Sequence, residues 1–139
     1  MITVNGYIKD SSMLPEGIAI TFGQEMMEEQ GGFLHFLKKI HETLAGHEEG
    51  DYWMHKCSNL PRIEVDHIYI IVANRLYGRV YCGGYKKPDK ANPKRGFTAD
   101  GREQEITWNY IVLSGPFERC PFKRTLKGFQ GFRYTTKLF

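Results

Sequence analysis

The segment HIYIIVA, residues 67–73, contains the longest apolar run in the chain and indicates where the centre of the fold lies. A short continuous run that is rich in β-branched residues is typical of a strand buried on both faces. The pair Asn74-Arg75 follows, and then comes LYGRVYCGGY at 76–85. Two strand-like segments that are separated by two residues predict a β-hairpin. Glycines in the second segment indicate bulges or tight bends.

Further strand patterns flank this hairpin. We predict strands at 52–57, 105–114 and 132–139, and a short N-terminal strand within ITVNGYI at 2–8. Residues 18–22 alternate in polarity, which fits either another strand or the lead into a helix. The sequence therefore predicts about five to seven strands.

A helical pattern occupies residues 23–45. Its apolar positions recur at spacings of four, three and four, at Phe33, Leu37, Ile40 and Leu44. Gly31-Gly32 predicts a break into two helices, and Gly46 is a natural stop before the acidic loop GHEEGD at 46–51. We expect one α+β domain over 1–139, in which one or two helices pack on a small β-barrel. The N-terminal strand and the acidic helical region fall in 1–50, and the barrel strands fall in 51–139.

The composition is that of an ordinary single domain. The chain has 139 residues, of which 41% are hydrophobic and 25% are charged. The start lacks a signal-peptide pattern, and no apolar run reaches the ~18 residues that a membrane span needs. The three cysteines have no paired spacing, which indicates reduced thiols. We therefore expect a cytoplasmic protein with no membrane partner.

Charge is distributed unevenly along the chain. Residues 1–70 carry five Lys/Arg and eleven Asp/Glu, whereas residues 71–139 carry fourteen and five. Such asymmetry indicates a nucleic-acid or other anionic partner, unless the two halves interleave and the charges mix on the surface. We predict a long exposed loop at 86–104 whose cations contact phosphates. These cations are Lys86, Lys87, Lys90, Lys94, Arg95 and Arg102. The alternative is a loop that is merely solvated.

Aromatic residues suggest a binding pocket. Tyr77, Tyr81 and Tyr85 share one parity, so we expect them on one face of their strand. Such a face could stack a base, although core packing would account for most of these rings. The predicted pocket residues are Trp53, Lys56, Tyr85 and Trp108, with Arg133 close by as a further nucleic-acid contact.

Motifs for catalysis, metals and cofactors are weak. His55 and Cys57 share a strand face, but the paired ligand spacing of a zinc site does not occur. Neither a GxSxG frame nor a phosphate-binding glycine loop is present. We therefore expect no metal and no cofactor, and a binding protein rather than an enzyme.

Several of these segments resemble the PUA-like superfamily, in particular its ASCH and EVE branches. The resemblance lies in YWMHK at 52–56, Leu60-Pro61, HIYIIV at 67–72 and LYGRV at 76–80. The run GFQGFRY at 128–134 is similar to a closing motif of small ASCH-like proteins of phage and prophage type. About half of the chain is covered, and the N-terminal 45 residues depart from a minimal ASCH domain.

The resemblance implies a five- or six-stranded pseudo-barrel that binds RNA or a modified base in a cleft beside it. RNA rather than DNA is the expected partner. Some ASCH members are amidohydrolases on modified nucleosides and use a Lys, a Thr and a Glu. Lys56 is the one position that the sequence matches to that set, so a small amidohydrolase remains an alternative. Another alternative is a protein-binding module, such as a phage-encoded inhibitor of a host protein, that uses the acidic region from Glu25 to Asp51.

Overall fold

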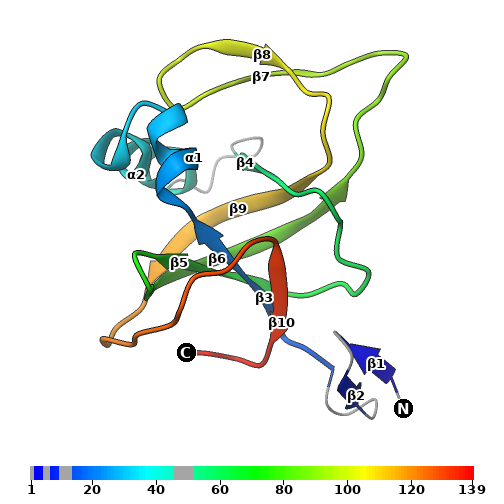
Figure 1. Cartoon of the computed structure of the whole chain (residues 1–139), viewed down its shortest axis with the longest axis vertical. Helices are drawn as coiled ribbons and strands as arrows, with labels where there is room; N and C mark the ends of the chain where they lie inside the picture. The colour runs from blue at the N-terminus through cyan, green and yellow to red at the C-terminus, as the bar shows by residue number, and fades with distance from the viewer. Residues whose placement is uncertain (1, 5–6, 10–13, 46–51) are drawn as a thin grey trace.

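The computed structural model describes residues 2–4, 7–9, 14–45 and 52–139, which form an α+β fold (Figure 1). Six strands make one mixed sheet in the order β10-β3-β5-β6-β9-β4. The bounds of these strands are β3 (Gly17–Phe22), β4 (Tyr52–Lys56), β5 (His67–Val72), β6 (Arg75–Lys86), β9 (Tyr110–Arg119) and β10 (Phe132–Thr135). Outside the sheet lie two helices and two hairpins: α1 (Gln24–Glu29), α2 (Phe33–Ala45), β1 (Ile2–Val4) with β2 (Tyr7–Lys9), and β7 (Arg95–Phe97) with β8 (Glu103–Glu105).

The main sheet is open. Strands β3 and β5 run parallel and the other neighbours run antiparallel. Among the described residues, the two outer strands, β10 and β4, do not pair with each other. The prediction of helices packed on a sheet is confirmed, but the prediction that the sheet closes into a barrel is wrong. The described part of the chain also holds more strands than the five to seven expected.

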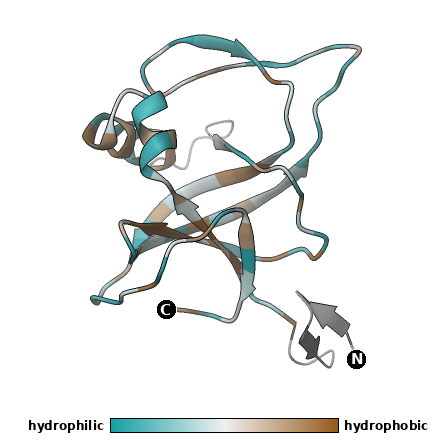
Figure 2. Ribbon diagram, viewed as in Figure 1, coloured by the Kyte–Doolittle hydropathy of each residue, from teal (hydrophilic) through white to brown (hydrophobic). Residues whose placement is uncertain are grey.

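Different elements cover the two faces of the sheet. Apolar side chains of β3, β5 and β9 form the main core with α1 and α2, whose buried residues are Met27, Phe36, Ile40 and Leu44. On the other face, Tyr69 and Ile71 pack against the C-terminal segment through Leu126, Phe129 and Leu138. A third cluster, at Ile106, Tyr110 and Val112, lies where the β7–β8 hairpin joins β9. Figure 2 shows the apolar β5 in the middle of this arrangement.

The hairpin predicted at 67–85 is confirmed, with β5 buried in the sheet interior. Ala73 and Asn74 form its turn and have positive φ angles of 50° and 59°. The prediction that Tyr77, Tyr81 and Tyr85 share one face of their strand is wrong. Register shifts at Ile70/Ile71 and at Cys82/Tyr85 change which face each residue occupies. Tyr77 and Tyr85 therefore pack on the main core, whereas Tyr81 is exposed and lies against His67.

Three segment boundaries differ from the predictions. The region 86–104 is not a structureless loop, because β7 and β8 pair within it. The strand expected at 105–114 begins later, as β9 at Tyr110. The N-terminal segment holds two paired strands rather than one. Short polar strands such as Arg95–Phe97 and Glu103–Glu105 carry too little alternation to be recognised by pattern.

The predicted helix break is confirmed at Gly31 and Gly32, whose φ angles are 104° and 102°. These angles lie in the region that glycine adopts readily, so the break needs these residues. The acidic loop at 46–51 lies outside the described residues. No helix in the described part of the chain is long and apolar enough to cross a membrane.

Gly115 provides a test of how α2 seats on β9. A Cβ atom at Gly115 would overlap the Leu44 carbonyl oxygen and lie 2.8 Å from its carbonyl carbon. Because backbone cannot move aside cheaply, Gly115→Ala is expected to cost about 1–3 kcal/mol of unfolding free energy. Urea denaturation measures the loss. Gly23→Ser is the matched control, since Gly23 has nothing within 4 Å and serine is favoured at a helix N-cap. Equal stability of the two variants would contradict this packing.

Candidate functional site

The candidate site lies at the free edge of β4. This strand pairs with β9 on one side, and in the described chain no strand pairs with its other side. The helices cover one face of the sheet here and the β7–β8 hairpin covers the other. The helices and the hairpin stand on either side of β4 (Figure 1). Residues of β4, the helices and the hairpin together line a partly open pocket.

A hydrogen-bonded clamp joins the hairpin to the helices. The Ala99 N–H donates to Gln30 Oε1 at 2.7 Å, and the Ala99 carbonyl oxygen accepts from His35 Nε2 at 2.8 Å. Arg102 also donates to the Glu29 carbonyl oxygen. The turn that presents Ala99 is held by Thr98, a buried residue whose hydroxyl accepts from the Arg102 N–H at 2.9 Å. The hairpin is therefore fixed across the sheet edge.

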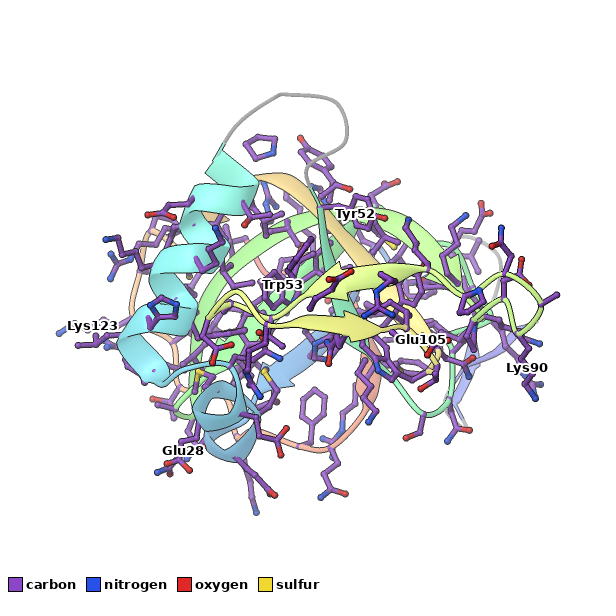
Figure 3. All side chains as sticks on the ribbon, turned by 90° about the horizontal axis from the view of Figure 1, so that it is seen from above. Glu28, Tyr52, Trp53, Lys90, Glu105 and Lys123 are labelled. Carbon is purple, nitrogen blue, oxygen red and sulfur yellow. The ribbon has the colours of Figure 1, made fainter. Side chains whose placement is uncertain are left out.

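This pocket has a volume of about 600 Å³. This volume falls in the usual range of small-molecule sites. Four aromatic side chains line it, Tyr52, Trp53, Phe97 and Trp108. Trp53 is held by an edge-on contact with Phe36 at 5.5 Å, and Trp108 by one with Tyr110 at 5.9 Å. Phe97 is 67% exposed and stands at the rim. Figure 3 places Trp53 between α2 and the hairpin.

Polar groups complete the lining. They are Glu29, Gln30, Lys39, Thr43, Lys56, Thr98 and Gln104. The main chain of β4 adds to them. Cys57 N–H donates to the Asn109 carbonyl oxygen at 3.0 Å, so these residues form a hydrogen-bonded pair of the antiparallel ladder. Because bonded and non-bonded pairs alternate, the N–H and C=O of Met54 face away from β9, toward the pocket side. A ligand there meets one donor and one acceptor in fixed positions.

His55 forms part of the pocket wall as a neutral group. Its ring lies 5.9 Å from Phe22, and burial lowers its pKa from the ordinary 6.5 to about 4. At neutral pH the imidazole is therefore uncharged, with one nitrogen that donates and one that accepts. The cations of the pocket are Lys39 and Lys56, and both side chains are exposed.

Three of the four predicted pocket residues line this space together: Trp53, Lys56 and Trp108. Tyr85 is not among the lining residues. Its hydroxyl donates to the Ile63 carbonyl oxygen at 2.7 Å, and burial raises its pKa. Arg133 lies on β10, at the opposite edge of the sheet, with its guanidinium 4.4 Å from the Phe129 ring centre. The structure therefore does not bring Tyr85 and Arg133 to this pocket.

The predicted loop cations fall into two groups. Arg95 forms an ion pair with Glu103 at 2.6 Å, and Arg102 forms one with Asp100 at 3.1 Å. Lys94 contacts the Tyr52 hydroxyl and lies 4.9 Å from that ring centre. In the described chain no carboxylate lies within 4 Å of the remaining three, Lys86, Lys87 and Lys90, which are exposed. These three have charge that is free for a partner.

Pattern reasoning missed several lining residues. Lys39 and Thr43 are four apart, so their spacing shows that they share a helix face, but not that this face meets a pocket. Phe97 stands alone in a polar segment and gives no local signal. Its role depends on the hairpin, which the sequence pattern did not reveal.

His55 and Cys57 do not come together as ligands. His55 faces the pocket, whereas Cys57 is buried and its thiol donates to the Asn59 carbonyl oxygen at 2.8 Å. No group of three or more metal-ligating side chains lies together within the described ranges.

The neutral state of His55 has a measurable consequence. In the unfolded chain, His55 binds a proton as the pH falls below its ordinary pKa of 6.5. In the folded chain, the same imidazole stays neutral until the pH approaches its lowered pKa of about 4. Stability is therefore lost as pH falls through this window. Between about pH 7 and about pH 5, the wild-type protein should lose about 2 kcal/mol more unfolding free energy than His55→Gln. Urea titrations at the two pH values measure this difference. The pKa of His41 is also lowered, by burial and then by Arg119, but it contributes to both proteins alike. Equal losses in the two proteins would show that His55 is not desolvated.

Comparison with protein-family models, with curated proteins and with solved structures found no match to this chain. The geometry of the pocket and the distribution of charge are thus the grounds for a functional assignment.

Proposed function

We propose that the protein binds nucleic acid, and that its pocket at the edge of β4 receives one unstacked base of a single-stranded RNA. The observation that carries the proposal is the lining of the pocket. Aromatic rings alternate there with fixed hydrogen-bonding groups, and two lysines stand at its margin. A base offers flat faces for stacking, an edge of donors and acceptors, and a phosphate on each side.

Each part of the base has a counterpart among the lining residues. Phe97 and Trp108 provide ring faces. The main chain of Met54 and the neutral imidazole of His55 provide donors and acceptors for the base edge. Lys39 and Lys56 provide charge for phosphates, and Lys86, Lys87 and Lys90 extend that charge along the neighbouring loop. The lining thus offers rings, neutral hydrogen-bonding groups and two cations to a nucleotide, and among the residues that the structure describes Glu29 is its one carboxylate.

The resemblance to PUA-like domains supports the same proposal. It implies a cleft beside a barrel; the sheet here is open, and the pocket lies beside the sheet edge that β4 forms. The proposal thus includes membership of the PUA-like superfamily. The competing idea of an acidic protein-binding face rests on α1, where Glu25, Glu28 and Glu29 are exposed. In α2, however, Lys38 and Lys39 offset Glu42, and residues 46–51 lie outside the described chain.

Fluorescence anisotropy with short single-stranded and duplex RNA and DNA tests the proposal. Phe97→Ala should weaken binding of single-stranded RNA by about 1–3 kcal/mol, because one stacked base loses its ring. Phe97 is a suitable first target, since its exposed side chain contributes little to the core. Trp108→Ala should act in the same direction.

Tyr81→Ala is the matched control, because Tyr81 is a half-exposed ring that does not line the pocket. It should bind as the wild-type protein does. The proposal fails if the wild-type protein binds no oligonucleotide at low salt. A preference for DNA over RNA would correct the partner but leave the pocket assignment in place.

A second candidate function is hydrolysis of an acylated nucleoside. Thr43 and Glu29 line the pocket together with Lys56. These are the three residue types that the ASCH resemblance implies for amidohydrolases. Turnover of an acylated nucleoside that is lost in both Lys56→Ala and Thr43→Val, but retained in Lys87→Ala, would favour this function. Absence of turnover across a panel of acylated nucleosides would remove it.

A further inference from the structure

The C-terminal region, from Arg119 onward, carries positive charge without any acidic residue, and it is separate from the loop that the charge pattern first suggested. From Arg119 to the last residue there are six Lys/Arg and no Asp/Glu. The region 86–105, by contrast, has six Lys/Arg and four Asp/Glu. Most of the excess charge of the second half of the chain therefore belongs to the C-terminal region.

Part of this region, residues 119–129, is named here the basic strap. It has almost no regular secondary structure, but hydrogen bonds fix it across the β5–β6 turn. Cys120 N–H donates to the Tyr77 carbonyl oxygen at 3.1 Å, and Leu126 N–H donates to that of Asn74 at 3.0 Å. In return, Leu76 N–H donates to the Arg124 carbonyl oxygen at 2.9 Å. The strap is therefore held in one shape before any partner binds.

Side chains anchor the strap as well. The Asn74 side-chain oxygen accepts from Gly128 N–H at 2.9 Å, and the Thr21 hydroxyl accepts from Phe129 N–H at 3.1 Å. Leu126 and Phe129 pack beneath it on the second face of the sheet. Apolar residues thus point inward, which leaves the charged residues of the strap on the outside.

Five exposed cations belong to the strap or lie beside it: Arg75, Arg119, Lys123, Arg124 and Lys127. The Arg119 guanidinium lies 5.8 Å from the Tyr77 ring centre, toward the face that the helices cover. Arg75 joins them because it lies opposite Thr125 in an isolated bridge. Within the described chain, none of the five has a carboxylate within 4 Å. Glu118 is the nearest acidic residue in sequence, and it is bound to Arg79 at 3.0 Å. Like charges held together without neutralisation favour an anionic partner.

The chemistry of the strap favours a polynucleotide as that partner. Phe122, which is 48% exposed and lies edge-on to Phe139, directly precedes Lys123 in the sequence, so the strap also offers an aromatic ring. Lys123 and Lys90 lie on opposite sides of the molecule (Figure 3). A single nucleotide in the pocket could not span both sides, whereas a longer strand or a folded RNA could.

We propose that the basic strap, together with Arg75, binds the phosphate backbone of the same nucleic acid whose base enters the pocket. This inference rests on the proposed function and adds to it a second contact surface and a minimum length of partner. Backbone contacts of this kind position the ligand and supply affinity without reading sequence. The strap would supply most of the salt-dependent affinity, and the pocket would supply selectivity.

The test compares two triple charge reversals on opposite sides of the molecule. One variant carries Lys123→Glu, Arg124→Glu and Lys127→Glu, and the matched variant carries Lys86→Glu, Lys87→Glu and Lys90→Glu. All six side chains are exposed, so both variants should fold, which thermal unfolding verifies. Anisotropy is measured with a short and a long RNA at several salt concentrations.

The strap variant should bind the long RNA roughly ten-fold or more weakly, and the slope of log K against log salt should fall by about 2. The loop variant should show a smaller loss of affinity and a smaller change of the salt slope. Unchanged affinity and slope in the strap variant, while the wild-type protein binds RNA, overturn this inference and leave the proposed function intact. Absence of wild-type binding to any oligonucleotide overturns both. Binding to phosphatidylserine vesicles without binding to RNA overturns the choice of a polynucleotide.

Discussion

The clamp on Ala99 is the contact on which the site depends. The hairpin leaves the sheet after Lys86 and returns at Tyr110, and the bonds of Ala99 join its tip to both helices. Gln30 and His35 hold the N–H and the carbonyl oxygen of Ala99 from either side of the Gly31-Gly32 break. A continuous helix would carry these two side chains in other directions. Two glycines that are unfavourable for a helix thus create the geometry that closes the pocket.

Local patterns predicted the elements whose signal is contained in their own residues. The β5–β6 hairpin and the two helices were recognisable because apolar periodicity and glycine punctuation are local. Local patterns did not show which face of a strand each residue occupies or which strands pair. The register shifts around Tyr77 and Tyr85 moved Tyr81 to solvent, although all three tyrosines share a parity. Barrel closure and the β7–β8 hairpin depend on pairing between segments that are apart in the sequence. The residues of Arg95–Phe97 and Glu103–Glu105 have no pattern that predicts a strand.

The same limit applies to the site. Trp53 and Trp108 could be selected because large rings with a polar atom suit ligand contact, and both line the pocket. The charge of each half of the chain could not distinguish the surface of the 86–104 region from that of the basic strap. Hairpin pairing brings Glu103 to Arg95, and the turn brings Asp100 to Arg102, which reduces the charge that the loop offers. Backbone pairing brings Arg75 to the strap from a distant part of the sequence. Charge density on a surface is therefore a property of the fold.

An uncovered edge strand is a hazard, because its free N–H and C=O groups invite pairing with another chain. β4 is such a strand, and the helices and the hairpin shield it without pairing to it. If another strand paired with β4, its hydrogen bonds would occupy the main-chain N–H and C=O of Met54. The helices and the hairpin do not pair with β4, so those groups stay available in a partly sheltered pocket, where water competes for them less than on an open surface. The arrangement that protects the edge of the sheet is therefore also the one that makes it a binding site.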